Sequence, residues 1–361
     1  MSVAPALDSP AQATEPARSA LPAKAFRSLD GLRAVSITLV LMDHLGKPWS
    51  RRPLDLGVGN YGHLGVVIFF VISGLLITSL LMAERDRHGH ISLKMFYARR
   101  ALRIFPAAYC YIACVFLMWL AGASQMGPHD FALALTYTVN FLPWPSWPIG
   151  HLWSLSVEEQ FYLLWPATFV TLTLRGATRV ALAVMLLGPL ARAAAWALFR
   201  DTPYGDLPMF PMVADSLAVG CLLAIGRERL ESQKWYLRLL EPGWSIFFVG
   251  LVLVLNRFTG YGVVETIGRS VTNVALALLV HRFVHHSWDP VGRFLNSGPM
   301  VLIGQLSYSF YLWQQLFLDR SSMAWHNMFP QNLILAILAA MASYYLLEKP
   351  LMGLRHRLRP F

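Results

Sequence analysis

Two basic side chains share one face of the first apolar segment. In the string RSLDGLRAVSITLVLMDH, Arg33 and His44 stand eleven positions apart, close to a whole number of α-helical turns. If the segment is helical, His44 lies about 16 Å further along the axis than Arg33. Asp30 precedes Arg33 by one turn, and we expect the two to pair. Histidine is a suitable general base for a hydroxyl at neutral pH, so His44 is a candidate catalytic base; a histidine that only packs in a helix bundle is the alternative.

Two arginines three residues apart form a second candidate group. In FYARRALRIFP, Arg100 and Arg103 fall on one face of a predicted helix. A guanidinium group binds phosphate oxygens in a bidentate way, so these residues and Arg33 are candidates for binding an anionic ligand. The alternative is that they anchor a cytoplasmic loop, as basic residues beside membrane spans do.

Two glutamates open a later apolar run, HLWSLSVEEQFYLLWP. Consecutive helical residues point about 100° apart, so only one of Glu158 and Glu159 can face a given cavity. A carboxylate inside a membrane needs a partner or water, and a structural ion pair is the alternative to a functional role. In GVVIFFVISGLLIT, the pair Ser73-Gly74 favours close helix packing over a nucleophilic role for Ser73.

The segments that carry these residues are predicted to cross a membrane. Of the 361 residues, 56% are hydrophobic and only 14% are charged, whereas soluble proteins carry about 25% charged residues. We therefore expect an all-α, polytopic transmembrane helix bundle. The candidate apolar runs fall at about 32–49, 62–82, 104–122, 131–143, 152–174, 179–198, 208–226, 243–257, 263–285, 299–318 and 331–348.

The run 131–143 is the weakest of these candidates. It is shorter than the roughly 20 residues that a span needs, contains Asn140, and leads into several prolines. If it is re-entrant or interfacial, most basic loops fall on one side, which the positive-inside rule makes the cytoplasm. We therefore predict about ten spans plus one re-entrant or interfacial segment, with both termini cytoplasmic. The basic C-terminal residues Arg355, Arg357 and Arg359 then fall on the cytoplasmic side, as the rule requires. The loop with Lys47, Arg51 and Arg52 falls on the other side and is the one exception to the rule.

The rest of the composition points to one membrane domain. Residues 1–26 are rich in Ala and Pro and lack a signal-peptide core, which indicates a disordered cytoplasmic tail; residues 27–361 form the transmembrane domain, expected in the inner (plasma) membrane. The net charge of +10 is explained by cytoplasmic loops, so no nucleic-acid partner is expected. Cys110, Cys114 and Cys221 lie in apolar runs, which indicates buried small side chains rather than disulfides or a metal cluster.

Several strings together resemble the acyltransferase-3 family. They are LDGLRAVSITLVLMDH, VVIFFVISGLLIT, FYARRALRIFP, HLWSLSVEEQFY, GQLSYSFYLW and the closing EKP, and they run from Arg27 to about Pro350. Members of this family are membrane enzymes that O-acylate lipopolysaccharide O-antigen, peptidoglycan, exopolysaccharides and some small molecules. The resemblance implies a helical membrane enzyme with an acyl-CoA donor on the cytoplasmic side and an acceptor reached from the other side.

The resemblance also assigns roles to the candidate residues. Arg33 and His44 match the family's motif of a basic residue, ten others and a histidine. Arg100 and Arg103 match its paired arginines, and Glu158 matches the glutamate after WSL. The implied mechanism has the arginines bind the phosphates of the donor, His44 act as general base, and Glu158 orient the histidine or the acceptor.

Two departures from the family pattern stand out. The family often has a histidine after YLW, whereas Gln314 follows Trp313 here. Some members carry an extracytoplasmic esterase-like domain after the last span, and this sequence has none, so transfer is expected to be direct or to use a separate extracytoplasmic partner.

The expected function is transfer of an acyl group, most simply acetyl, from acyl-CoA to a hydroxyl of a carbohydrate, lipid-linked sugar or small molecule. No tightly bound cofactor and no metal is expected in the reaction. Direct transfer and a short-lived acyl-enzyme both remain open. A transporter or flippase for a polar lipid or sugar is the alternative function, with the buried Arg, His and Glu side chains as its pathway. The absence of an inverted repeat argues against it.

Overall fold

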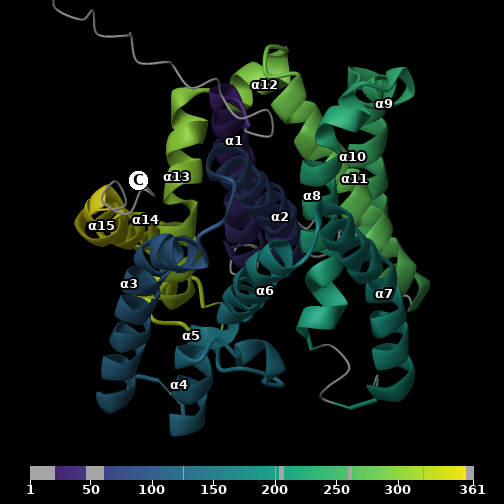
Figure 1. The fold of residues 1–361 in the computed structure, drawn as a ribbon. Coiled ribbons are helices and arrows are strands. Elements are labelled where there is room, and N and C mark those ends of the chain that lie inside the picture. The colour runs from purple at the N-terminus through teal and green to yellow at the C-terminus, as the bar shows by residue number, and fades with distance from the viewer. Residues whose placement is uncertain are drawn as a thin grey trace, which may run out of the picture.

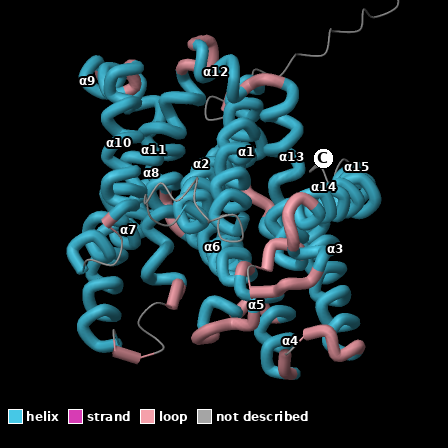
Figure 2. Tube along the Cα trace, turned by 180° about the vertical axis from the view of Figure 1, so that it is seen from behind, coloured by secondary structure: helices cyan, strands magenta, loops and turns pink. Residues whose placement is uncertain are grey.

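The computed structural model describes residues 21–45, 61–124, 126–199, 201–202, 207–258, 262–319 and 321–354. Every regular element within these ranges is a helix (Figure 2). The all-α prediction is therefore confirmed. Three predicted features lie outside the described residues: residues 1–20 of the tail, the loop with Lys47, Arg51 and Arg52, and the basic end with Arg355, Arg357 and Arg359.

The helices follow the apolar runs of the sequence, and several short helices and turns connect them. In chain order they are α1 (Ala23–Leu45), α2 (Tyr61–His88), α3 (Leu93–Leu120), α4 (Pro128–Leu135), η1 (Val139–Phe141), α5 (Trp147–Gly150), α6 (Leu152–Thr171), α7 (Leu174–Phe199), α8 (Phe210–Glu231), α9 (Lys234–Leu239), α10 (Pro242–Arg257), η2 (Val264–Gly268), α11 (Arg269–His285), α12 (Pro290–Leu295), α13 (Gly298–Trp313), η3 (Gln314–Leu316), η4 (Trp325–Asn327), α14 (Gln331–Ser343), η5 (Tyr344–Glu348) and α15 (Lys349–Gly353).

Helices α1 and α2 lie in the middle of the bundle. α1 packs against α2 and α13, and α2 packs against α8. Figure 1 shows α3, α14 and α15 on one side of this centre and α7, α10 and α11 on the other. The most apolar 18-residue stretch of α2 is 83% buried and that of α7 only 17%. α2 is thus a core helix, whereas α7 presents its apolar side chains outward, as a lipid-facing helix does.

Glycines allow a close contact between α2 and α8. A β-carbon on Gly74 would lie 2.0 Å from the Leu217 carbonyl oxygen, and one on Gly220 would lie 2.2 Å from that of Val71. Neither would fit, so the two backbones approach this closely because both positions are glycine. The prediction that Ser73-Gly74 marks close helix packing is confirmed, and the contact fixes where Ser73 sits.

The segment 131–143 does not form a spanning helix. Helix α4 has eight residues, which is about 12 Å and well short of a membrane's hydrocarbon core of about 30 Å. The chain then turns through η1, where the buried Asn140 exchanges amide hydrogen bonds of 2.9 and 3.4 Å with Gln160 of α6. The polar residue that weakened this run as a span therefore has a structural partner.

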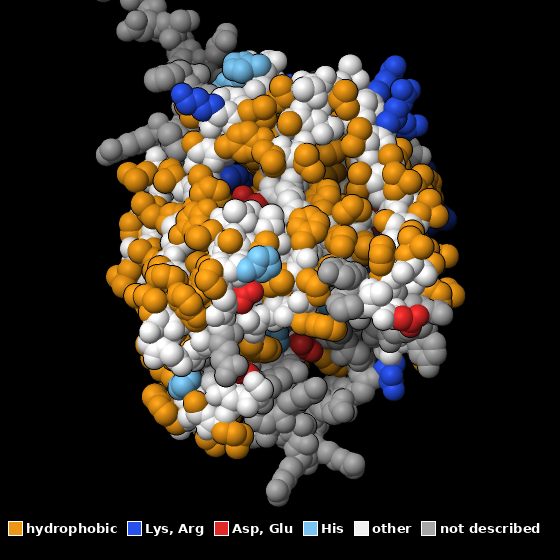
Figure 3. All heavy atoms as spheres, turned by 90° about the horizontal axis from the view of Figure 1, so that it is seen from below, with side chains coloured by type: hydrophobic (Ala, Val, Ile, Leu, Met, Phe, Trp, Pro, Cys, Tyr) orange, Lys and Arg blue, Asp and Glu red, His pale blue; other side chains and the backbone are white. Residues whose placement is uncertain are grey.

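Among the residues that the structure describes, five helices are long and apolar enough to cross a membrane: α2, α3, α7, α8 and the helix Gln331–Gly353. This number supports a membrane protein but does not reach the ten predicted spans. The main reason is that α10, α11 and α13 have only 16, 17 and 16 residues, and charged residues interrupt α1 and α6. Figure 3 shows the end of the bundle opposite α9 and α12, where hydrophobic side chains spread over much of the described surface and charged ones are isolated.

Candidate active site

The predicted anion-binding arginines meet inside the bundle. Arg33 of α1 and Arg103 of α3 line a pocket of about 80 Å³ together with Glu158 of α6. The Asp30 carboxylate lies 3.5 Å from the Arg33 guanidinium, as their spacing predicts. Arg100 lies within electrostatic range of both Arg33 and Glu158. We call this pocket and these five residues the arginine pocket; it places three positive groups beside two negative ones.

Contacts near the start of α3 hold Arg99 and Arg100 in different surroundings. Ser92 caps the helix, and its backbone N–H donates to Glu84 at 3.0 Å. The other carboxylate oxygen of Glu84 accepts a hydrogen bond from Arg99 at 2.9 Å. Arg100 points in a different direction, and its guanidinium lies 4.9 Å from the ring centre of Tyr162. Neighbouring arginines of one motif thus have separate environments.

Glu158 is bound within the arginine pocket. The Ser73 hydroxyl donates to its Oε1 at 2.7 Å, and the carboxylate lies within electrostatic range of Arg33, Arg100 and Arg103. Glu159 is not among the residues that line the pocket, and its Oε1 makes no hydrogen bond to the described residues. The prediction that only one of the two glutamates faces a given cavity is therefore confirmed for this pocket.

A chain of amide groups orients His44. The Trp147 carbonyl can only accept, so the Gln315 amide nitrogen that lies 2.6 Å away donates to it. The oxygen of that amide then accepts from the Gln314 nitrogen at 3.1 Å. The Gln314 oxygen accordingly faces His44 as an acceptor, 2.6 Å from Nδ1. His44 must therefore carry a proton on Nδ1, and in the neutral ring Nε2 bears the lone pair.

His44 opens onto a much larger space, which we call the histidine cavity. It has a volume of about 600 Å³. The Trp147 ring forms part of its wall and lies 5.3 Å from the His44 ring. Its lining also includes Asp43, Gly62, His63, Val66, Trp144, His151, Trp153, Arg192, Trp196, Glu265, Arg269 and Tyr311.

His151 is a second histidine in this cavity. Its side chain is buried, with 6% of its surface exposed. The rings of Tyr111 and Tyr311 lie 5.3 and 5.4 Å from its own, and His44 is within electrostatic range. Neither ring nitrogen makes a well-formed hydrogen bond to the described residues. A buried imidazole without such a bond has capacity to bind a ligand hydroxyl.

The two histidines lie at one level of the bundle and Glu158 at another. Glu158 follows His151 by seven residues, which is about 10 Å along α6. Arg33 and His44 are about 16 Å apart along α1. Arg33 lines the same pocket as Glu158, and His44 lines the same cavity as His151. Glu158 thus belongs to the level of Arg33, whereas Gln314 of η3 hydrogen bonds to His44.

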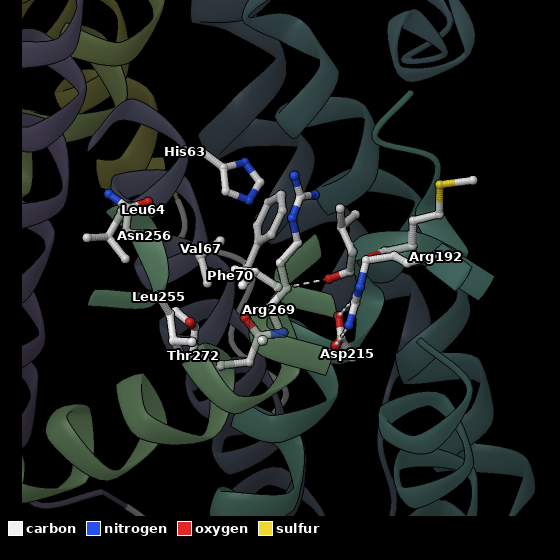
Figure 4. A pocket seen from close by; sticks show the side chains of 16 residues that line it. His63, Leu64, Val67, Phe70, Arg192, Asp215, Leu255, Asn256, Arg269 and Thr272 are labelled. Atoms are coloured by element: carbon white, nitrogen blue, oxygen red, sulfur yellow. Dashed lines mark hydrogen bonds and ion pairs between the residues drawn. The ribbon is translucent and has the colours of Figure 1, made fainter. Parts of the chain in front are cut away.

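A small pocket borders the histidine cavity on the side of α7 and α8, and His63 and Arg269 line both (Figure 4). Here Arg192 donates to both carboxylate oxygens of Asp215, at 3.0 and 2.8 Å. It also donates to the Thr266 carbonyl at 3.1 Å. Thr266 lies in the π-helical turn η2, which departs from the regular α-helical bonding pattern. Arg192 is thus bound by several partners, and we interpret it as a structural ion pair.

Sequence analysis found the residues of the arginine pocket and His44 but missed the groups around His44. In the sequence, Gln314 is only a departure from a family motif, and His151 is only part of a matching string. The His44–Gln314 contact joins positions 270 residues apart, which the sequence alone does not bring together. The one local signal was that Gln314 takes the place of a histidine next to an aromatic motif.

Helices of spanning length and buried ionisable groups define a helical membrane protein with two adjacent polar sites. A family model described as an acyltransferase domain, that of acyltransferase-3, matches residues 26–348. The chain therefore belongs to the acyltransferase-3 family. Acyl transfer is the class of reaction that this match supports.

Known proteins with similar sequences carry related descriptions. A putative O-acetyltransferase of Staphylococcus aureus (strain COL) is 30% identical over 310 residues, covering 79% of this chain and 49% of that protein. O-acetyltransferase OatA of S. aureus (strain NCTC 8325) is 30% identical over 307 residues, with 79% and 49% covered. Putative peptidoglycan O-acetyltransferase YrhL of Bacillus subtilis is 29% identical over 361 residues, with 90% and 54% covered. The chain spans about half the length of these relatives. No solved structure matches it.

Proposed function

We propose that this chain is a membrane O-acyltransferase in which the arginine pocket binds an anionic acyl donor and His44 activates an acceptor hydroxyl in the histidine cavity. One observation carries the proposal. The two sites share part of their walls, since Val66 and Tyr311 line both. A donor held in the arginine pocket needs to extend only about 16 Å along α1 to bring its acyl group to His44.

Acyl-CoA is the proposed donor. Its phosphates suit the guanidinium groups of Arg33, Arg100 and Arg103, which bind oxyanions in a bidentate way. The two carboxylates of the pocket, Asp30 and Glu158, balance only part of this positive charge. The remaining charge favours an anionic ligand. The pantetheine arm is long and uncharged, as a group must be to pass from the arginine pocket toward the histidine cavity.

The proposed reaction uses His44 as a general base. Its Nε2 accepts the proton of the acceptor hydroxyl while the hydroxyl oxygen attacks the thioester carbonyl. The bond between carbon and sulfur then breaks, and the leaving thiolate takes up this proton from the imidazolium. Gln314 keeps Nδ1 protonated and the ring in position throughout.

Glu158 has a different proposed role from the one the family resemblance suggested. Its partners are Ser73 and the arginines rather than His44. We propose that Glu158 keeps the guanidinium groups in place, while Gln314 orients the base. Direct transfer is the simpler route, because Ser73 lies at the level of the arginines and not at that of His44.

The acceptor and the orientation in the membrane complete the proposal. Tryptophan rings and polar groups line the histidine cavity, a combination that suits the apolar faces and hydroxyls of a carbohydrate; a lipid-linked sugar or a small hydroxyl compound would also fit. We propose about ten spans with both termini cytoplasmic, so that the arginine pocket is reached from the cytoplasm and the histidine cavity from the other side. A reporter fused after Phe361 should read as cytoplasmic, and an extracytoplasmic signal would contradict this topology.

The test is transfer by purified protein. The protein in detergent should transfer radiolabelled acetyl from acetyl-CoA to a carbohydrate acceptor, or hydrolyse acetyl-CoA slowly when no acceptor is present. A transporter would instead move a polar lipid or sugar across proteoliposomes without consuming acetyl-CoA. Transport with no acetyl-CoA consumption, at a level that the His44→Ala variant shares, would overturn the proposal.

A further inference from the structure

Three potential metal ligands gather where α8 and α11 both end. Oε1 of Glu231 lies 2.9 Å from Nε2 of His281 and 3.8 Å from Nδ1 of His285. All three ligand atoms lie within 4.8 Å of one another. The group is at the end of the bundle that carries α9, at the top of Figure 1. None of the three residues lines the arginine pocket or the histidine cavity.

These distances are close to those of a coordination shell. Nitrogen and oxygen ligands bind Zn²⁺ at about 2.0–2.2 Å, which places neighbouring ligand atoms of a tetrahedral site roughly 3.3 Å apart. The two separations in the structure, 2.9 and 3.8 Å, lie within about half an ångström of that value. The side chain of His285 is 35% exposed and has room to turn inward. Small side-chain rotations would therefore complete a three-ligand site.

The buried histidine of the group is already oriented. The Tyr236 hydroxyl of α9 lies 2.6 Å from Nδ1 of His281, and both side chains are buried, with 3% and 2% exposed. This contact turns Nε2 of His281 toward Glu231. Histidines that bind metals are commonly oriented in this way through their second nitrogen.

The sequence and the helix ends also favour a cation. His281 and His285 are four residues apart on α11, the spacing that places two imidazoles on one helical face. The carboxyl ends of α8 and α11 meet here, and each carries partial negative charge. A His–Glu hydrogen bond needs only one imidazole. Here a second imidazole, that of His285, also lies near the same carboxylate oxygen of Glu231, as in a chelating metal site.

Two arginines oppose a cation at this place. Arg282 is next to His281 in the sequence, but it forms an ion pair with Asp289. Arg227, one turn before Glu231, lies within electrostatic range of the carboxylate. A ligand set of two imidazoles and one carboxylate binds transition metals more strongly than it binds Mg²⁺ or Ca²⁺. The positive charge of Arg227 also favours a transition metal, because Mg²⁺ and Ca²⁺ depend more on the charge of the carboxylate.

We propose that Glu231, His281 and His285 bind one Zn²⁺ ion, with water as the fourth ligand. The ion would link the end of α8 to the end of α11, away from the acyl-transfer site. The proposal does not depend on the proposed enzymatic function.

The test is Zn²⁺ binding by the untagged full-length protein in detergent. After treatment with EDTA, the protein is incubated with Zn²⁺ and desalted, and bound zinc is measured by mass spectrometry. We expect about one ion per chain and a higher Tm with Zn²⁺ than without it. Glu231→Gln and His285→Ala should each weaken binding at least tenfold and remove the Tm rise. These two side chains are partly exposed, so both variants should fold without metal.

His88→Ala is the control, because His88 is an exposed histidine at the end of α2 and is not part of the group. It should bind zinc as the wild type does. Wild-type protein that retains no more zinc than Glu231→Gln would overturn the proposal. Equal loss of zinc in His88→Ala and His285→Ala would also overturn it, since the binding would then come from exposed histidines in general.

Discussion

The arginine pocket and the histidine cavity are organised in opposite ways. In the arginine pocket, three guanidinium groups face two carboxylates, so charge is left over for a ligand. On the Nδ1 side of His44, a row of neutral amides has its donors and acceptors fixed in order from the Trp147 carbonyl outward. The first arrangement attracts an anion by net charge. The second gives Nδ1 of His44 a defined protonation state through uncharged groups.

This difference indicates which measurements separate the two sites. Changes in the arginine pocket should affect how tightly the donor binds. Changes around His44 should affect turnover or acceptor binding at a given donor occupancy. Replacing single residues at each site therefore tests whether binding and chemistry are divided as proposed.

The largest effect is expected for His44. General-base catalysis contributes about 10²–10⁴-fold, so His44→Ala should lower the transfer rate at least a hundredfold. His44→Gln keeps a hydrogen-bonding side chain but cannot take up the proton, and it should be almost as inactive. The rate is measured per folded molecule in detergent, with expression recorded separately. Substantial turnover by His44→Gln would mean that His44 is a packing residue.

The next effect is expected in the arginine pocket. A hydrogen bond to a charged group contributes about 1.5–3 kcal/mol, so Arg100→Ala or Arg103→Ala should raise the KM for acyl-CoA by about tenfold or more. Lysine at either position should restore part of the affinity, because it lacks the planar fork. Initial rates over a range of donor concentrations give the values.

Arg99→Ala is the matched control for these two variants. Arg99 belongs to the same motif, but it binds Glu84 outside the pocket. Its loss should leave the KM for the donor unchanged. Equal effects at Arg99, Arg100 and Arg103 would show that the motif acts only through overall positive charge.

A smaller effect is expected for Gln314. One hydrogen bond contributes about 0.5–1.5 kcal/mol, so Gln314→Leu should lower kcat by about two- to tenfold. The KM for the donor should stay the same, because the arginine pocket is unaffected. Gln314→His retains an acceptor for Nδ1 of His44 and should recover most of the rate. A raised donor KM in Gln314→Leu, with kcat unchanged, would contradict a positioning role.

The smallest effect is expected for His151. His151→Phe keeps the ring but removes both nitrogens. If the imidazole binds an acceptor hydroxyl, the KM for the acceptor should rise by a few-fold, up to about tenfold. The KM for acyl-CoA provides the internal control and should not change. If neither KM nor kcat changes, His151 serves only in packing with Tyr111 and Tyr311.

The sequence predicted the features that depend on local spacing. The apolar runs became helices, Asp30 pairs with Arg33, and only one glutamate of Glu158 and Glu159 lines the arginine pocket. Helical periodicity is enough for such predictions, since it determines which neighbours share a face.

The features that depend on contacts between distant helices were not predictable in the same way. Nothing in α1 indicates that Gln314, in η3, will reach His44. Glu158 was expected near the histidine, but the seven residues that separate it from His151 place it at the level of the arginines. The number of spans also depends on packing. Length and composition alone do not show whether a short helix such as α13 or a charged helix such as α1 crosses the membrane.

The amide chain behind His44 restricts where the two substrates can lie. Because Gln314 offers only an oxygen to Nδ1, a proton that the ring gains on Nε2 cannot leave through the amides. It must leave from the same nitrogen that received it. In the proposed mechanism, the acceptor hydroxyl and the departing sulfur would therefore both come within reach of one edge of the imidazole. This requirement favours a ternary complex with both substrates bound together and sets the direction from which the acceptor approaches the thioester.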